Sequence, residues 1–306
     1  MTPPPPGPAP TARAIRRATI GVFLIFMACG FGFASWASRL VAVRLEIGIA
    51  PGQMGLLLLC CSAGSVGAMP VSGRLIQRFG ERRVLAAFAA LALVGLVGAG
   101  LGAAATASAL WVAVPLVALG AGIGVWDVAM NVAATDVERA LHRTILPRFH
   151  AGYSFGTVLA SGVGVGLARL GVPVAVHFAL VAAVCAGALA WGVTTLLPGG
   201  ASAGAPRGAP RDTPGGAPDT SGHAPGGAPD TSGHAPPGAP GQPGPGRAPS
   251  PWRESRVILL GVVVLALSLA EGAAGDWLAS GIVQAFKTPE ATGIIGLTVF
   301  LTCQTA

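Results

Sequence analysis

Two polar residues in one apolar run are the first candidates for chemistry in this sequence. Asp127 and Asn131 stand four residues apart in GIGVWDVAMNVAATDVER. In a helix, this spacing places both side chains on one face. An ionisable group inside an apolar helix is costly, so it usually faces a cavity or a partner. We expect Asp127 and Asn131 to bind substrate or carry a proton, and the alternative for Asp127 is a structural hydrogen bond that holds a neighbouring helix.

Glu271 is the second acidic candidate. It lies in AEGAAGDW, well inside a later apolar run. By the rise per residue of a helix, it falls near or just beyond the middle of a membrane. A carboxyl there is able to take up and release a proton during a reaction cycle. We therefore expect Asp127 and Glu271 to be the acids that exchange protons, whereas Asp276, beside Trp277, is expected to be an acid that snorkels to the outer interface.

One motif suggests an enzyme. GYSFG, at residues 152–156, matches the G-x-S-x-G pattern of serine hydrolases, with His150 four residues before Ser154. That chemistry requires a strand–turn–helix context, and here the motif opens an apolar helix rich in small residues, which is typical of helix packing. The five cysteines have no metal-ligand spacing. We expect no enzyme activity, no metal and no cofactor.

The elements that position these residues are membrane helices. The 306 residues are 52% hydrophobic and only 10% charged, whereas soluble domains have about 25% charged residues. A transmembrane helix needs about 20 mostly apolar residues. Spans are expected at 18–38, 53–75, 84–104, 108–133, 149–170, 173–196 and 257–279, and an eighth begins near 291 and stops at Ala306. The predicted fold class is an all-α polytopic membrane protein.

The basic residues predict the orientation of these spans. Of the 19 Lys and Arg residues, 15 lie in segments that are cytoplasmic if the N-terminus is cytoplasmic. Positive charge in short loops resists translocation, so this is the expected topology of a multi-pass protein of the cell inner (cytoplasmic) membrane. Because the Arg residues are scattered through loops between apolar runs, we expect the lipid bilayer, and no nucleic acid, to be a partner.

Charged residues at the ends of the spans are expected to be solvated. Asp136, Glu138 and Arg139 follow the fourth span at its cytoplasmic end, where a solvated helix cap is expected. Arg39 follows Trp36 at the outer end of the first span and is expected to be an interface anchor.

Composition divides the chain into four segments. Residues 1–17 are expected to form a disordered N-terminal tail, and residues 18–197 are expected to contain six transmembrane helices. Residues 198–255 are a Gly/Pro-rich cytoplasmic linker, in which GGAPDTSGHAP occurs twice, at 215–225 and 226–236. Residues 256–306 contain the seventh expected span and the start of the eighth.

The basic segment GRLIQRFGERRV, residues 73–84, joins the second and third spans. Gly80 allows a tight turn, and Gly73 is expected to let two helix backbones approach closely. The segment resembles the signature loop of the major facilitator superfamily, G-x-x-x-D-[RK]-x-G-[RK]-[RK]. The matching residues are Gly73, Arg78, Gly80, Arg82 and Arg83, while Gln77 stands where the family usually has Asp. The resemblance implies a gating loop in which Gln77 removes a charge that holds a helix end of the opposite half.

Further segments are similar to a bacterial branch of this superfamily, the fucose-permease-like and YbjJ-type carriers. They are FASWASRL, the Asp127 stretch, ILPRFHAGYSFG and AEGAAGDW. The resemblance implies a six-helix N-terminal half at residues 18–197 and an incomplete C-terminal half at residues 256–306, with helix 7 and part of helix 8, in a C-terminally truncated chain. It also implies a secondary transporter that moves a small molecule by alternating access, in which we expect Asp127 and Glu271 to couple transport to protons.

Two other classes of protein stay open at this point. The first is a non-transporting truncated remnant of a carrier. The second is a seven-helix receptor-type membrane protein. A photoreceptor of that class uses a Schiff-base lysine, and the single lysine, Lys287, lies outside the predicted spans.

Overall fold

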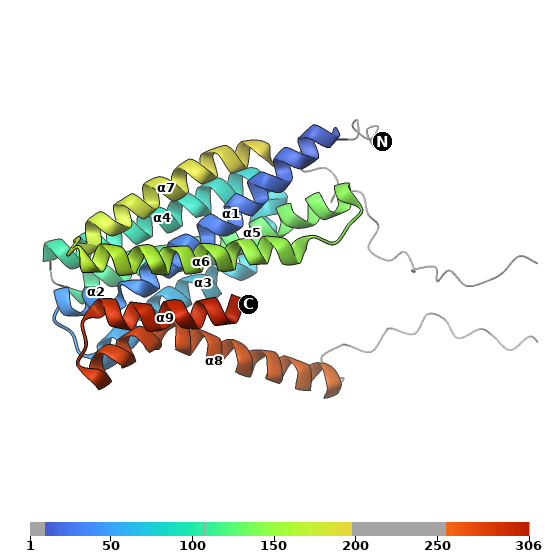
Figure 1. The fold of residues 1–306 in the computed structure, drawn as a ribbon. Helices are drawn as coiled ribbons and strands as arrows, with labels where there is room; N and C mark the ends of the chain where they lie inside the picture. The colour runs from blue at the N-terminus through green and yellow to red at the C-terminus, as the bar shows by residue number, and fades with distance from the viewer. Residues whose placement is uncertain (1–9, 107, 198–254, 306) are drawn as a thin grey trace, which may run out of the picture. The chain divides into compact units, whose positions relative to one another are not determined.

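The computed structural model describes residues 10–106, 108–197 and 255–305, which form helices joined by short turns (Figure 1). In chain order these are α1 (Ala12–Ser38), α2 (Leu40–Glu46), α3 (Pro51–Phe79), α4 (Glu81–Thr106), α5 (Ala109–Leu141), α6 (Leu146–Arg169), α7 (Val174–Thr195), α8 (Ser255–Phe286) and α9 (Glu290–Thr305). The described residues contain no strand, so the predicted all-α class is confirmed. Except for Ser255, the predicted linker 198–255 lies outside the described residues, and so do both copies of its repeat.

The chain divides into two compact units. The first contains residues 1–204 and 269–306, and the second contains residues 205–268. Of the second unit, the structure describes residues 255–268, which form the first part of α8. All contacts considered below lie within the first unit.

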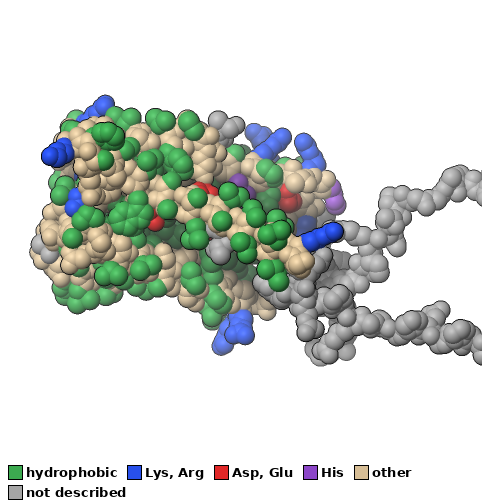
Figure 2. All heavy atoms as spheres, turned by 90° about the horizontal axis from the view of Figure 1, so that it is seen from below, with side chains coloured by type: hydrophobic (Ala, Val, Ile, Leu, Met, Phe, Trp, Pro, Cys, Tyr) green, Lys and Arg blue, Asp and Glu red, His purple; other side chains and the backbone are tan. Residues whose placement is uncertain are grey.

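Six of the described helices, α1 and α3 to α7, are long and apolar enough to cross a membrane. They cover the six spans predicted for residues 18–196, and α8 covers the seventh predicted span. Several helices continue past the predicted boundaries, because backbone hydrogen bonding does not stop where the apolar run ends. Figure 2 shows one face of the molecule, on which most Lys and Arg side chains stand toward the ends of the helices and hydrophobic side chains cover much of the surface between.

The core of the first unit is built around α5 and α1. Helix α5 packs most extensively on α3 and α4, and α1 packs on α6 and α7. The largest side chains buried among them are Trp36, Trp126, Phe26, Phe149 and Phe178. Many large apolar side chains on the same helices are exposed instead. A surface of this kind suits contact with lipid, because exposing so many apolar side chains to water would be unfavourable.

Glycines bring α3 and α5 into direct backbone contact. A Cβ atom added at Gly120 would overlap the carbonyl group of Cys61, and one added at Gly64 would lie 2.9 Å from the backbone nitrogen of Ala121. In membranes such close crossings replace the hydrophobic effect as a source of helix association. These two glycines therefore set the distance between α3 and α5.

Candidate functional site

Asp127 and Asn131 lie on one face of α5, as their spacing predicts. The Asn131 amide donates a hydrogen bond to the backbone carbonyl of Asp127 at 2.9 Å, and its nitrogen lies 3.5 Å from Asp127 Oδ1. Both side chains are partly buried, next to the fully buried Trp126. The contact restrains the two polar groups relative to each other and leaves most of the accepting capacity of the carboxylate unused.

Helices α1 and α6 supply the groups that surround Asp127. The charge of Asp127 reaches the Cys29 thiol of α1 and the Tyr153 hydroxyl of α6, and His150 of α6 acts on Asp127 in turn. His150 also stands edge-on to the ring of Phe26, with the ring centroids 5.2 Å apart. Because α1 packs on both α5 and α6, three helices meet around one ionisable group.

Glu271 lies in the middle of α8, and its side chain is exposed. Its charge also reaches the Tyr153 hydroxyl. The structure thus brings both predicted acids within electrostatic range of one phenol, although it shows no direct contact between them in the described residues. Tyr153 is a residue that the sequence analysis missed, and its being the single tyrosine of the chain was the available signal.

Most of the signature loop is helical, and Gly80 is the single residue between α3 and α4. Gly80 has φ 83°, a conformation that favours glycine, and its N–H donates to the carbonyl of Ile76 at 2.9 Å. The turn predicted at Gly80 is therefore confirmed. Nearby, the Arg82 guanidinium donates to the carbonyl of Leu196 at the end of α7. Arg78 lies over the ring of Phe79, 5.4 Å from its centroid.

The role predicted for Gly73 in helix packing is wrong in this structure. A Cβ atom at Gly73 would meet no atom within 4 Å, because α3 continues through this residue to Phe79 with Gly73 on an exposed side. Gln77 and Arg83 are exposed as well. Within the described residues, Arg82 is the predicted gating residue that contacts a distant segment of the chain, through the Leu196 carbonyl.

Glu138 caps the next helix, in place of the solvated end predicted from its position. Its carboxylate accepts hydrogen bonds from the backbone N–H groups of Ile145 and Leu146, at 2.6 and 2.7 Å, where α6 begins. These donors have no partner within the helix, so the carboxylate fixes the turn between α5 and α6. Asp136, also predicted to be solvated, is buried and pairs with Arg139 at 2.8 Å.

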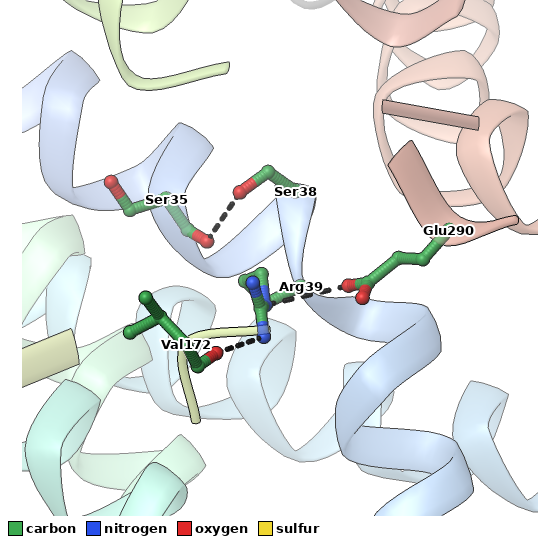
Figure 3. A network of polar contacts seen from close by, with 5 residues as sticks. All are labelled: Ser35, Ser38, Arg39, Val172 and Glu290. Carbon is green, nitrogen blue, oxygen red and sulfur yellow. Dashed lines mark hydrogen bonds and ion pairs between the residues drawn. The ribbon is translucent and has the colours of Figure 1, made fainter. Parts of the chain in front are cut away.

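A buried polar network surrounds Arg39, at the junction of α1 and α2 (Figure 3). Its guanidinium donates to the carbonyl of Val172, between α6 and α7, at 2.8 Å. Its Nε lies 3.4 Å from a carboxylate oxygen of Glu290, the first residue of α9. The residue is only 4% exposed, so the prediction of an interface anchor is wrong. Nothing in the local sequence shows partners so far along the chain.

Burial and charge act in opposite directions on Glu290. Burial raises the pKa of this carboxyl above its ordinary value of 4.5, and the charge of Arg39 lowers it by a smaller amount. The charge of Arg39 also reaches His177 of α7, which is fully buried. The end of the bundle at Arg39 therefore holds several charged or titratable groups away from solvent.

No group of three or more His, Cys, Asp or Glu side chains in the described residues has the arrangement of a metal site.

The comparisons with known proteins point to a transporter family. Residues 18–303 match the sequence profile of the Major Facilitator Superfamily.

Two curated relatives are bacterial proteins named as transporters. An uncharacterized MFS-type transporter of Yersinia pestis is 37% identical over 140 residues, which are 45% of this chain and 35% of that protein. An uncharacterized transporter of Sinorhizobium fredii (strain NBRC 101917 / NGR234) is 37% identical over 169 residues, 55% of this chain and 44% of that protein. These matches span less than half the length of either relative. No solved structure matches the chain.

Proposed function

The chain belongs to the major facilitator superfamily, and we propose that it acts in a secondary transporter that moves a small molecule across the cytoplasmic membrane by alternating access, coupled to protons. Carriers of this kind move substrate between two helix bundles that close alternately around a central site. The six membrane-spanning helices and the transporter-named relatives favour this function over a seven-helix receptor.

The observation that carries the proton coupling is the position of Asp127. It is partly buried inside an apolar helix and has no charged partner within ion-pair distance in the described residues. Keeping an ionisable group there is costly, and such groups usually mark a substrate or proton pathway. The charges of Asp127 and Glu271 both act on the Tyr153 hydroxyl, which makes Tyr153 a further candidate for the same pathway.

The remaining features of the proposal concern topology and subfamily. The placement of 15 of the 19 basic residues supports a cytoplasmic N-terminus, with Arg82 and Arg83 on the cytoplasmic side. The segments FASWASRL and AEGAAGDW support a place in the fucose-permease-like, YbjJ-type branch. The signature loop, from Gly73 to Arg83, would gate the cytoplasmic side without the usual Asp at Gln77.

The test replaces each acid by its amide in the full-length carrier. An amide keeps the size and one acceptor oxygen of the carboxyl but does not take up or release a proton. We expect Asp127→Asn and Glu271→Gln to insert normally and to lose accumulation driven by a pH gradient, while exchange without a gradient is less affected. The assay uses membrane vesicles and a substrate found by screening labelled small molecules.

A control is Glu46→Gln, because Glu46 is an exposed acid at the end of the short helix α2, outside the membrane-spanning helices. This variant should keep the pH profile of the unmodified carrier. If both Asp127→Asn and Glu271→Gln also keep that profile, the two acids are scaffold and the coupling site lies elsewhere.

A further inference from the structure

The contact between Arg39 and Glu290 joins two parts of the chain that are far apart in sequence. Arg39 follows α1, and Glu290 begins α9. Through its second contact, with the Val172 carbonyl, the same guanidinium also holds the turn between α6 and α7 (Figure 3). One side chain therefore connects α9 to two separate places in the first six spans.

The interface behind this ion pair consists of uncharged contacts. Ala37 packs with Ala279 of α8 and Leu297 of α9 in one buried cluster. Further along α9, the hydroxyls of Thr298 and Ser161 lie 2.6 Å apart and share a hydrogen bond. Contacts of this kind separate without leaving a charge behind, so the ion pair is the part of the interface that is most sensitive to hydration.

The ion pair itself is incompletely satisfied. The distance of 3.4 Å is longer than that of a charge-assisted hydrogen bond, about 2.7–2.9 Å. Buried Nε and Nη1 of Arg39 and Oε1 of Glu290 have no hydrogen-bond partner in the described part of the chain. Both groups would gain hydration if this end of the bundle opened. A contact whose attraction is opposed by lost hydration is suited to form and break repeatedly.

We propose that Arg39 and Glu290 form a latch that holds α9 against the first six spans and separates when this end of the carrier opens. The latch rests on the proposed function, and with the N-terminus cytoplasmic it lies at the outer end. It supplies a conformational contact that the family assignment does not specify. Loss of Glu290 leaves the buried Arg39 charge without its partner, and loss of Arg39 leaves the partly buried Glu290 carboxylate, 21% exposed, without its cation, so both single losses should favour the open state.

The test measures the exposure of a cysteine placed under the latch. Ala37 is 4% exposed and is covered by Ala279 and Leu297, and a cysteine is only slightly larger than alanine. Ala37→Cys is made in the full chain with Cys29, Cys60, Cys61 and Cys303 replaced and Cys185 kept. The chain is placed in lipid nanodiscs, and labelling by a bulky water-soluble maleimide is followed by peptide mass spectrometry without substrate or pH gradient.

We expect Arg39→Gln and Glu290→Gln each to raise the labelling rate of the cysteine introduced by Ala37→Cys at least about tenfold. This change corresponds to about 1.4 kcal/mol in the opening equilibrium. The double variant should label no faster than the faster single variant, because both changes break one contact. The control Lys287→Gln, which removes an exposed cation close to Glu290 in the chain, should have no effect.

Cys185 distinguishes opening from unfolding. It is 1% exposed in the core of the first unit and should stay unlabelled when only the latch opens. Rates equal to that of Lys287→Gln in either single variant, or independent effects that multiply in the double variant, would overturn the latch. Since this readout needs no transport, failure of the coupling test with Asp127→Asn would leave the latch result interpretable by itself.

Discussion

The substitution Gly120→Ala tests whether the backbones of α3 and α5 meet as the structure places them. The added methyl group would overlap the Cys61 carbonyl oxygen and lie 2.7 Å from the carbonyl carbon, whereas ordinary contacts begin at about 3.4 Å. The obstacle is backbone, which has no alternative rotamer. The helices must therefore separate, and the neighbouring contact of Gly64 with α5 is lost in the same movement.

The magnitude follows from two opposing effects. Overpacking of this kind costs about 1–3 kcal/mol, and a clash with backbone belongs at the upper end of that range. Alanine recovers up to about 1 kcal/mol of helix propensity over glycine. We therefore expect Gly120→Ala to destabilise the folded chain by about 2 kcal/mol. Gly67→Ala, on α3, would meet no atom within 4 Å and should be neutral or slightly stabilising.

The native cysteines report on unfolding directly. Cys29 and Cys185 are buried, whereas Cys303 is exposed. In an SDS titration in mixed micelles, a thiol-reactive dye should label Cys303 at once and the two buried cysteines only as the bundle unfolds. Gly120→Ala should unfold at a clearly lower SDS fraction than Gly67→Ala. Equal unfolding of the two variants would refute the close crossing of α3 and α5.

Two further predictions concern the ends of the helices. Glu138→Ala should destabilise the chain by about 1–2 kcal/mol in the same titration, because two N–H groups at the start of α6 lose their acceptor. The control is Arg143→Ala, at an exposed neighbouring residue. Equal stability of the two variants would contradict the capping role of Glu138. Reporter fusions near residues 104–107 should be external and fusions within 198–255 cytoplasmic, as the basic residues predict, and the opposite pattern would reverse the topology.

The positions of the membrane spans could be predicted from the sequence because they depend on one local property. A run of about 20 apolar residues is both necessary and visible, and all six predicted spans of the first half coincide with helices. The ends of the helices could not be predicted equally well. Helix α5 continues past the apolar run to Leu141. Helix α2 is a separate helix of seven residues, too short to be recognised as a membrane span.

Glycines show where local information ends. The sequence predicts that glycines in apolar runs serve close packing, but it does not show which side of a helix meets a neighbour. Gly120 and Gly67 both lie inside apolar runs of the sequence, yet a Cβ atom added at Gly120 would overlap backbone and one added at Gly67 would meet no atom within 4 Å. Only the rotation of each helix within the bundle separates them, and that rotation depends on every other helix.

The same reasoning explains why the surroundings of some charged residues were easier to predict than those of others. Asp127 is partly buried, as expected, because a charge in the middle of an apolar run is costly wherever the helix lies in the bundle. Arg39 and Glu138 stand at helix ends, where water would satisfy either side chain, so their sequence positions predict solvation. The partners of Arg39 are Val172 and Glu290, and the partner of Glu138 is the start of α6. Each partner lies on a later segment that crosses back to the same end of the bundle. A charged residue at a helix end is thus better judged by what the topology returns to that end than by its own neighbours.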